Sequence, residues 1–547
     1  MIFSAPMPQP RAEWRPRMSP FALNLSVTVW ILAVSNAGFW AQLNTVFKGA
    51  PLDLLGFGAA VAALTMFTLS LVTVPGLHRP ALALLLVISA VADHFQRSFG
   101  IVIDREMIQN AMLTTATESR HLLTLGFLRD VVLFGVLPAA LVFLPRLQPV
   151  PLRHWLWRYP LALIVSLALV AGLLMADFKT YSAAVREHRG MMATYQPGAV
   201  IAATGRYVKQ RFLTSKVSAA PLGRDARPGP LLAAAPKPVL LVLFVGETAR
   251  AANFGLDGYA RDTTPRLATA GVVNFADTWS CGTSTAVSLP CMFSALGQEN
   301  YSRMRFLGQE NLLDVLAHAG VRVDWVDNNT GDQGIAARTG ARRVDATIDP
   351  AACASGECTD AALLPILRQT MAEMTGNTVL VLHMIGSHGP AYYLRYPPEA
   401  EHFTPACRSA AFADCTTDEI VNAYDNSIRF TDQILTDAIG MMAAESRVLP
   451  AMIYMSDHGE SLGEGGLYLH AAPMFMAPDT QRKVPFLMWL SAPFQAALGV
   501  SQDCLARRAA ERQSHDVLFH SVLGLLDIES RVRQPGLDLT AECRNGA

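Results

Sequence analysis

Apolar stretches of two different lengths divide the chain into two halves. The stretches of the first half are long and lie at residues 21–43, 54–77, 80–99, 122–143 and 160–178. Each approaches the ~20 residues that an α-helix needs to cross a bilayer. The pattern therefore predicts an all-α transmembrane domain of five helices within residues 1–178.

The distribution of basic residues gives this domain an orientation. Residues 1–20 contain arginines and prolines but no small-residue cleavage site after a short apolar core, which indicates a cytoplasmic tail rather than a cleaved signal peptide. With that tail inside, the inner segments carry more basic residues than the outer ones, as the positive-inside rule requires. An odd number of spans then places everything after residue 178 on the outer side of the membrane.

The composition of the chain also agrees with a membrane domain followed by an outer domain. The chain has 547 residues, enough for two or more domains. Its mean hydropathy of +0.27 is unusual for a soluble protein. The net charge is −1 and charged residues make up only 16% of the chain, so nothing in the sequence indicates a nucleic-acid partner.

The connection after the third apolar stretch is too polar to cross a membrane and too long for a simple turn. Within it, Asn110, Thr114 and Glu118 recur at the four-residue spacing of one helix face. These side chains are candidates for holding a lipid headgroup at the outer surface. The spacing by itself favours an ordinary solvated loop.

Residues 179–237 join the two halves. Their first part interleaves basic residues with tyrosine and phenylalanine, a mixture typical of helices that rest on a membrane interface. Residues 218–238 are rich in proline, alanine and glycine. They predict a linker that only tethers the outer domain and lets it move over the membrane.

All eight cysteines lie in the second half of the chain. An even number of cysteines in such a region favours disulfides formed in an oxidising compartment. Buried free thiols or a zinc cluster are the alternatives, although no CxxC spacing supports a structural zinc cluster. Their order predicts four local pairs: Cys281 with Cys291, Cys353 with Cys358, Cys407 with Cys415, and Cys504 with Cys543.

Short apolar runs in the second half end in residues that bind metals. Unbroken branched runs are typical of strands buried in a parallel sheet, and the chemistry of such sheets lies beyond the carboxyl ends of their strands. The pattern predicts an α/β domain over residues 238–547 with a metal site at one edge of its sheet. The runs and their polar residues are 239–245 with Glu247, 378–385 with His388, and 451–455 with Asp457 and His458.

A segment rich in hydroxyl groups lies inside the first cysteine pair. A helix is expected to begin there, and a hydroxyl in its first turn would lie at the positive end of the helix dipole. Beside a metal, such an oxygen becomes a nucleophile, whereas capping the helix is its ordinary role. Spacing alone does not identify the attacking group among Thr283, Ser284, Thr285 and Ser288.

Glu247, Asp457, His458 and one hydroxyl would supply three oxygen ligands and one nitrogen ligand. This set suits Zn²⁺ in a four-coordinate catalytic site, with Mn²⁺ as the alternative. His388 and His470 both lie on glycine-rich loops after buried strands. Near a metal they would donate hydrogen bonds to phosphoryl oxygens or transfer a proton; a purely structural role is the alternative.

Six motifs of the second half together resemble one family, the lipid A phosphoethanolamine transferases. This family includes the polymyxin and colistin resistance enzymes of Gram-negative bacteria and belongs to the alkaline phosphatase/sulfatase superfamily. Five spans before an outer α/β domain is also its layout, so the resemblance covers nearly the whole chain. The motifs are Glu247-Thr248, Cys281-Gly-Thr-Ser-Thr285 with Ser288-Leu-Pro-Cys291, Asp327-Asn-Asn329, Gly386-Ser-His-Gly-Pro390, Ser456-Asp-His-Gly-Glu-Ser-Leu-Gly463 and Tyr468-Leu-His470.

This resemblance implies roles for individual residues. Thr285 matches the nucleophile, and Glu247, Thr285, Asp457 and His458 match the zinc ligands. Family members often have a lysine where this chain has Gln333, so the resemblance implies that this chain lacks a cationic contact to the phosphate or the acceptor. The positions that match substrate-binding residues are Asn110, Thr114, Glu118, Asn329, Thr330, His388 and His470.

The resemblance also implies an activity. We expect a monomeric enzyme of the bacterial inner membrane with its catalytic domain in the periplasm. It would transfer phosphoethanolamine from phosphatidylethanolamine to a lipid A phosphate through a phosphorylated threonine, and so confer resistance to polymyxin. The closest alternative is transfer of phosphoethanolamine or phosphoglycerol to another periplasmic glycan or glycolipid. A non-catalytic membrane sensor is a more distant one, and a sulfatase is disfavoured because no Cys-x-Pro-x-Arg segment exists.

Overall fold

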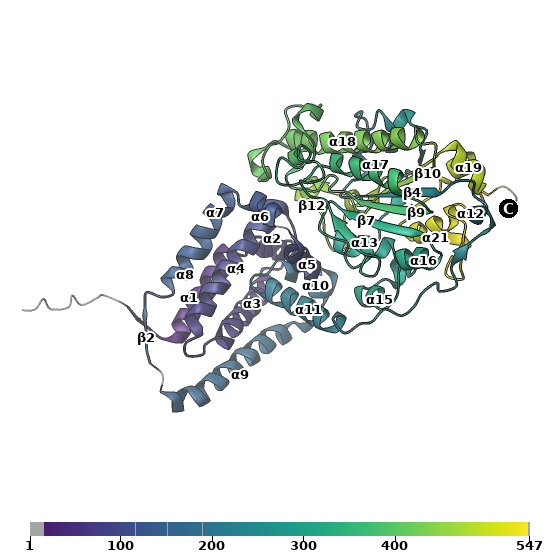
Figure 1. Cartoon of the computed structure of the whole chain (residues 1–547). Helices are drawn as coiled ribbons and strands as arrows, with labels where there is room; N and C mark the ends of the chain where they lie inside the picture. The colour runs from purple at the N-terminus through teal and green to yellow at the C-terminus, as the bar shows by residue number, and fades with distance from the viewer. Residues whose placement is uncertain (1–15, 115, 150, 189, 545–547) are drawn as a thin grey trace, which may run out of the picture. The chain divides into compact units, whose positions relative to one another are not determined.

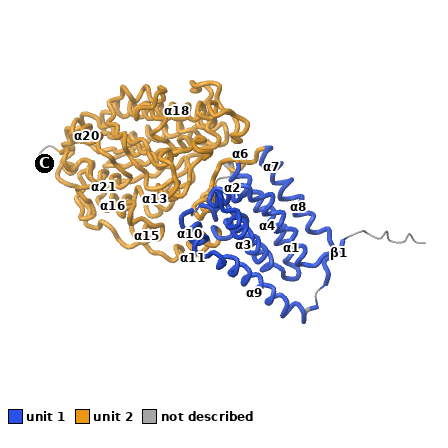
Figure 2. Tube along the Cα trace, turned by 180° about the vertical axis from the view of Figure 1, so that it is seen from behind, with its two compact units in different colours: residues 1–97, 125–203 blue, residues 98–124, 204–547 orange. Residues whose placement is uncertain are grey.

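A computed structural model describes residues 16–114, 116–149, 151–188 and 190–544. The chain forms two compact units, drawn in different colours in Figure 2. Unit 1 comprises Met1–Arg97 and Leu125–Ala203, and unit 2 comprises Ser98–Thr124 and Thr204–Ala547. Unit 1 is helical and unit 2 contains a large mixed sheet, so the predicted combination of an all-α membrane domain and an α/β domain is confirmed.

Three helices of the described part of unit 1 are long and apolar enough to cross a membrane. They are α3 (Pro51–Leu71), α4 (His78–Phe99) and α9 (Leu152–Ala176). The first predicted span is instead a pair of helices, α1 (Pro20–Val34) and α2 (Ala37–Val46), bent by 70° at their break. If this pair is one span, the count rises to four.

The fourth predicted span is a shorter helical run. It consists of α7 (Leu125–Val131), a π-helical segment η1 (Val132–Val136) and α8 (Leu137–Leu141), with 7, 5 and 5 residues. Pro138 lacks an N–H and so leaves the carbonyl of Phe134 without its helical partner. The indole of Trp30 donates to that carbonyl at 3.1 Å. The five predicted stretches thus correspond to three long helices, a bent pair and this run.

The boundaries of the last span also differ from the prediction. The apolar stretch predicts a start at residue 160, but α9 begins at Leu152 and contains Pro160 in its interior. The helix that follows, α10 (Phe178–Glu187), contributes Tyr181 to an aromatic core of unit 1, where its ring lies 5.5 Å from that of Phe57. Helix α11 (Gly198–Thr214) then leads toward the sheet domain.

The segment at residues 218–237 is not a free tether, and that prediction is wrong. Strand β3 (Arg227–Pro228) pairs with β16 (Ile528–Glu529), and the short helix α12 (Pro230–Ala233) follows it. Leu232 is buried in the main core of unit 2. Proline fixes φ in an extended region without needing an N–H partner, so a chain rich in proline and alanine can line a folded surface as well as form a linker.

A seven-stranded sheet forms the centre of unit 2 (Figure 1). Strands β10, β4, β9, β7 and β8 run parallel, while β14 is antiparallel to β10 and to β5. The central strand β4 is buried along its whole length, as its unbroken apolar run predicts. In spatial order the strands are β5 (Val273–Asn274), β14 (Phe486–Leu490), β10 (Leu449–Ser456), β4 (Val239–Gly246), β9 (Thr378–His383), β7 (Arg322–Asp327) and β8 (Ala341–Arg343).

Helices cover both faces of this sheet (Figure 1). One face carries α17 (Leu363–Glu373) and the long α18 (Thr417–Ala443), which begins with a capping box formed by Thr416 and Glu419. The other carries α13 (Thr285–Met292), α16 (Leu312–His318) and α21 (Asp516–Leu525), whose apolar side chains share a core with alternate residues of β4.

The structure contains the four disulfides that the order of the cysteines predicts, and no free cysteine remains among the described residues. Each closes a segment of unit 2. The bonds join Cys281 to Cys291, Cys353 to Cys358, Cys407 to Cys415, and Cys504 to Cys543.

Candidate active site

Two neighbouring strands deliver the candidate metal ligands to one point. Strands β4 and β10 are parallel and pair through Gly246 and Ser456, so the residues that follow them are adjacent. Those residues are Glu247, Asp457 and His458, all fully buried. One ligand atom from each lies within 4.8 Å of the others.

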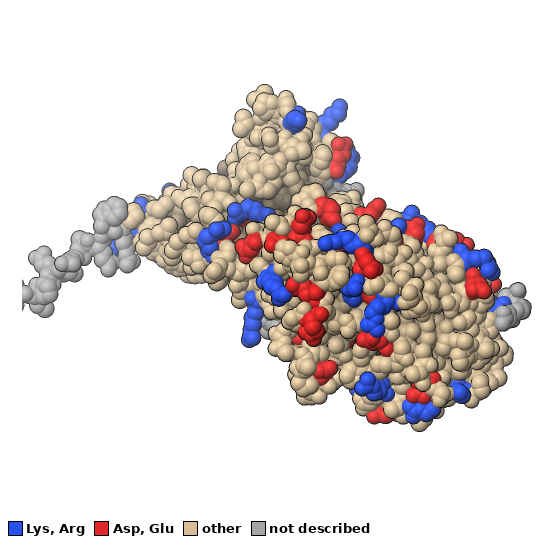
Figure 3. Space-filling model, turned by 90° about the horizontal axis from the view of Figure 1, so that it is seen from above, with Lys and Arg blue, Asp and Glu red and all other residues tan. Residues whose placement is uncertain are grey.

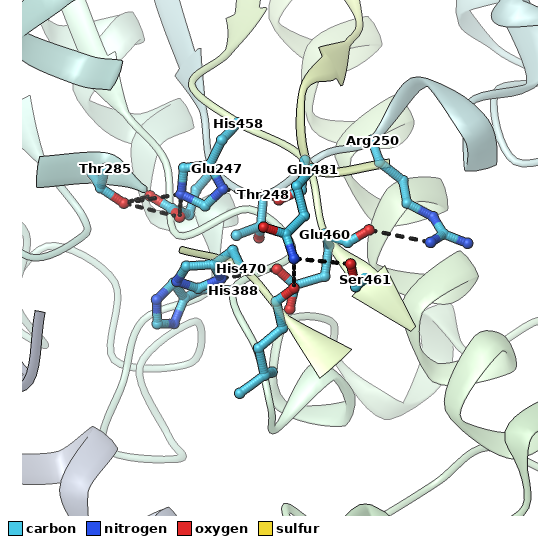
Figure 4. A network of polar contacts seen from close by, with 12 residues as sticks. Glu247, Thr248, Arg250, Thr285, His388, His458, Glu460, Ser461, His470 and Gln481 are labelled. Atoms are coloured by element: carbon cyan, nitrogen blue, oxygen red, sulfur yellow. Dashed lines mark hydrogen bonds and ion pairs between the residues drawn. The ribbon is translucent and has the colours of Figure 1, made fainter. Parts of the chain in front are cut away.

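Thr285 completes this cluster, as Figure 4 shows. It is the first residue of α13, so its hydroxyl sits at the positive end of the helix dipole. Its Oγ1 lies 3.0 Å from Glu247 Oε2 and 3.3 Å from His458 Nε2. Thr283, another of the four candidate hydroxyls, instead donates to the carbonyl of Ala472 at 2.7 Å. The geometry therefore selects Thr285 as the hydroxyl of the cluster.

The arrangement of polar atoms fits a divalent cation. His458 Nδ1 donates to the carbonyl of Gly459 at 2.9 Å, which leaves Nε2 facing the carboxylates. Asp457 Oδ1 accepts the His458 N–H, but its Oδ2 is buried without a hydrogen bond. Two carboxylates, an imidazole nitrogen and a hydroxyl that converge in this way form a donor set that could hold a divalent metal ion.

The electrostatics of the cluster also favour a bound cation. Burial opposes the charge of Glu247, yet the neighbouring imidazole of His458 holds the pKa of Glu247 well below its ordinary value. Burial and the charge of Glu247 raise the pKa of Asp457 to about 6. Burial disfavours the imidazolium of His458, but Asp457 and Glu247 outweigh it and raise the pKa of His458 to about 10. Buried carboxylates this close need a positive charge between them, which a proton or a metal ion supplies.

The polar loop after β7 donates a hydrogen bond to a carboxylate of the cluster. The amide of Asn329 donates to Glu247 Oε2 at 2.7 Å and to the carbonyl of Met384 at 2.9 Å. Asp327 accepts the backbone N–H of Asn329 and faces His383 Nδ1 at 3.0 Å. Burial opposes the charge of Asp327, but His383 lowers the pKa of Asp327 to about 2. Sequence reasoning missed His383, although a histidine ending an aliphatic run was a signal for it.

The two remaining histidines lie beside the cluster (Figure 4). The ring centre of His470 is 4.6 Å from that of His458 and 5.4 Å from that of His388. His470 Nδ1 is held 2.9 Å from Glu460 Oε2, so its Nε2 is the ring atom left for a substrate. Glu460 in turn accepts the hydroxyl of Tyr392 at 2.7 Å. Sequence reasoning had assigned no role to Glu460.

The residues proposed for headgroup binding belong to unit 2 by their packing. Helices α5 (Arg105–Leu113) and α6 (Ala116–Leu122) lie in its Ser98–Thr124 segment, where Phe99 packs 5.7 Å from Phe412. Asn110 and Thr114 are half-buried, and the hydroxyl of Thr114 donates to the carbonyl of Asn110 at 2.9 Å. Among the described residues, no hydrogen bond joins either to the metal cluster. The side chain of Glu118 lies outside the described part of the structure.

Two further positions that the resemblance had singled out lie in the same loop as Asn329. The backbone N–H of Thr330 donates to Asn329 Oδ1 at 2.8 Å. Gln333 is buried at a positive φ of 51°, and its carbonyl accepts from Arg303 at 2.8 Å.

Comparison with known proteins places these features in context. Residues 61–212 match the family described as phosphoethanolamine transferase EptA/EptB, and residues 240–528 match the sulfatase family. The chain is similar to phosphoethanolamine transferase EptA of Escherichia coli strain K12, with 37% identity over 542 residues, 97% of this chain and 98% of that protein. It is also similar to phosphatidylethanolamine transferase Mcr-1 of Escherichia coli, with 36% identity that covers 95% of this chain and 98% of that protein.

The structure has a full-length counterpart as well. The integral membrane protein lipooligosaccharide phosphoethanolamine transferase A of Neisseria meningitidis superposes with a TM-score of 0.91 and 34% identity. The match covers 97% of this chain and 100% of that one. The similarity therefore extends over both the helical unit and the sheet unit.

Proposed function

Because this chain belongs to the EptA/EptB family of phosphoethanolamine transferases, we propose that it moves phosphoethanolamine from phosphatidylethanolamine to a phosphate of lipid A, with Thr285 as the nucleophile. It is an integral protein of the bacterial inner membrane whose catalytic domain lies in the periplasm. The position of Thr285 Oγ1, 3.0 Å from Glu247 and 3.3 Å from His458, is the observation that carries the proposal.

The reaction needs two displacements at phosphorus. In the first, Thr285 Oγ1 forms a bond to the phosphorus of the donor phosphodiester, the bond to the glycerol oxygen breaks, and diacylglycerol leaves with a proton. In the second, an oxygen of the acceptor phosphate attacks the same phosphorus and the bond to Thr285 breaks. The products are a diphosphate in which phosphoethanolamine is joined to the acceptor phosphate through a P–O–P bond, and the hydroxyl of Thr285, which takes up a proton as it leaves.

The chain supplies most of what these steps require. A divalent cation held by Glu247, Asp457, His458 and the hydroxyl of Thr285 would act as a Lewis acid and favour loss of the hydroxyl proton; zinc is the ion we propose. The amide of Asn329 fixes the carboxylate of Glu247. His470, oriented by Glu460, and His388 are placed to donate hydrogen bonds to phosphoryl oxygens or to protonate the leaving oxygen.

Both substrates are proposed from named relatives and from chemistry. The Neisseria meningitidis counterpart is named for a lipooligosaccharide acceptor, and Mcr-1 is named for phosphatidylethanolamine. We infer that Asn110, Thr114 and Glu118 hold the donor headgroup, and that Asn329 and Thr330 also contact substrate. An added ammonium group would weaken the attraction of lipid A for cationic peptides such as polymyxin.

The boundaries of the working parts also belong to this proposal. We assign membrane spans to residues 1–178, interfacial helices and the docked connection to residues 179–237, and catalysis to residues 238–547. The enzyme would act as a monomer.

The test compares wild-type protein with Thr285→Ala and Thr285→Ser. In cells that express each variant, mass spectrometry of lipid A should show added phosphoethanolamine with wild type, less with serine and none with alanine. Modified lipid A in the alanine variant would overturn the role of Thr285. Modification of another glycan or glycolipid with lipid A unchanged would favour the alternative acceptors.

A further inference from the structure

A cavity of about 420 Å³ opens in unit 2 beside the metal cluster. It shares four residues with the candidate active site: Asp327, Asn329, Thr330 and His388. Its volume falls in the range of ~300–1,000 Å³ that is usual for small-molecule sites. Much of its lining is amide, hydroxyl, carboxylate and guanidinium, with few large apolar side chains, so it suits a polar headgroup rather than an acyl chain.

Two of the three carboxylates that line this cavity, Asp327 and Glu357, face a basic side chain. Asp327 faces His383 at 3.0 Å, and Glu357 is paired with Arg395 at 2.9 Å. Asp345 accepts the backbone N–H of Thr347 at 2.8 Å. Arg343 also lines the cavity, and no ion pair among the described residues involves it. Among the described residues of the lining, Arg343 is therefore a cationic group without a carboxylate partner, whereas the charge of Asp345 is held only by hydrogen bonds from Thr347.

The placement of Arg343 on strand β8 brings its side chain to the cavity. Arg343 pairs in register with Asp327 of β7, so the two side chains lie on the same face of the sheet. Its Nη2 donates to the carbonyl of Asn329 at 2.8 Å. The side chain is otherwise exposed, which leaves further N–H donors of the planar guanidinium for a ligand. Arg342, one residue earlier, faces the opposite side and does not line the cavity.

A guanidinium in this setting is suited to a phosphate. Arginine presents a rigid fork of donors that matches phosphate oxygens in a bidentate arrangement. In the proposed reaction the donor's phosphorus must come to Thr285 Oγ1, so a second phosphate needs its own binding site next to it. The acceptor carries a phosphomonoester, which bears more negative charge than the donor's phosphodiester. A single free guanidinium therefore favours the acceptor over the donor.

We propose that this cavity is the acceptor subsite and that Arg343 binds the phosphate of the acceptor while one of its oxygens attacks the phosphorus on Thr285. This inference rests on the proposed function. Arg343 itself forms and breaks no covalent bond. It holds the attacking phosphate in place and lowers the repulsion between two anionic groups.

Kinetics of the full-length enzyme, reconstituted with phosphatidylethanolamine, separate the two half-reactions. Release of diacylglycerol without acceptor reports the first, and transfer to purified bis-phosphorylated lipid A at varied concentration reports the second. The variants are Arg343→Gln and Arg343→Lys, with Arg342→Gln as the matched control. Metal content and Tm of each preparation are measured alongside, because a purely structural role acting through Asn329 would change them.

We expect Arg343→Gln to raise the acceptor KM by about tenfold or more while diacylglycerol release stays within about twofold of wild type. The acceptor KM of Arg343→Lys should lie between those of wild type and Arg343→Gln, because lysine keeps the positive charge but lacks the planar set of N–H donors. Arg342→Gln should match wild type in both half-reactions. Wild type and Arg343→Gln should bind dephosphorylated lipid A with the same affinity.

Two results would overturn the inference. An unchanged acceptor KM in Arg343→Gln would show that the cavity does not bind the acceptor phosphate. An equal loss of diacylglycerol release and transfer would show that Arg343 serves the donor, or acts only by holding Asn329. A wild-type enzyme that releases no diacylglycerol would instead refute the proposed function itself, so the two failures are distinguishable.

Discussion

His515 joins the two segments that carry the reactive groups, and its removal should separate them. The residue precedes α21 and is 1% exposed. Its Nδ1 accepts the backbone N–H of Cys281 at 3.1 Å, in the segment that leads to Thr285. Its Nε2 donates to the carbonyl of Ser456 at 2.9 Å, directly before Asp457. Burial lowers the pKa of His515 to about 3, so the ring stays neutral and keeps this tautomer near neutral pH.

The size of the effect follows from these two bonds. His515→Phe removes both and leaves a buried N–H and a buried carbonyl without partners, at about 1–3 kcal/mol each. The free energy of unfolding should fall by about 2–6 kcal/mol in total. A shift of Thr285 relative to Asp457 of the order of 1 Å would also lower kcat by about 10²-fold.

A matched control lies within α21, the helix that His515 precedes. His520 is also buried and accepts the backbone N–H of Gln534 at 3.1 Å, but it contacts neither segment of the site. We expect His520→Phe to lower Tm while kcat per bound metal ion stays near that of wild type. The assay is diacylglycerol release at a temperature well below the Tm of both variants. Equal kcat per metal ion in the two variants would refute the positioning role of His515.

Three further outcomes are expected from other parts of unit 2. Asn329→Leu removes a hydrogen bond to a charged carboxylate and one to the buried carbonyl of Met384, so kcat per bound metal ion should fall by about 10- to 100-fold and Tm should fall as well; an unchanged kcat would contradict the supporting role. Burial raises the pKa of Asp257 to about 7, so its proton stabilises the fold at low pH and that stability is lost as pH rises through 7. Asp257→Asn should therefore stabilise the protein more at pH 8 than at pH 5, by about 2 kcal/mol in chemical denaturation, and an equal effect at both values would refute the burial argument. Replacing Cys504 and Cys543 by alanine opens a loop with a sequence separation of 39 and should lower the free energy of unfolding by about 4 kcal/mol, whereas no loss in denaturation would argue against the bond.

Most of the sheet could be predicted because buried parallel strands carry a strong local signal. The run of branched residues in β4 ends in Gly246, and Glu247 follows in the structure as the sequence indicates. The same logic located Asp457 and His458 after β10. Because β4 and β10 pair in parallel, the residues that follow them come together whatever the conformation of the loops.

The remaining features depend on long-range packing that local patterns do not encode. Residues 218–237 have the composition of a linker, and only the core of unit 2 shows that Leu232 is buried. The polar support of the cluster by Asp327 and His383 requires strands β7 and β9 to be neighbours, which the order of strands along the chain does not reveal. The bounds of two membrane helices were not predicted, because α9 continues through Pro160, whereas the fourth run contains a π-helical segment just before Pro138.

The central claim is that Thr285 carries phosphoethanolamine between two lipids. Intact-protein mass spectrometry of the full-length enzyme, mixed with phosphatidylethanolamine and no acceptor, tests it most directly. The account predicts a gain of one phosphoethanolamine group, mapped by fragmentation to Thr285 and lost when lipid A is added. Two results would contradict it. One is turnover of both lipids while the phosphoethanolamine group is attached to another residue, and the other is full activity of Thr285→Ala.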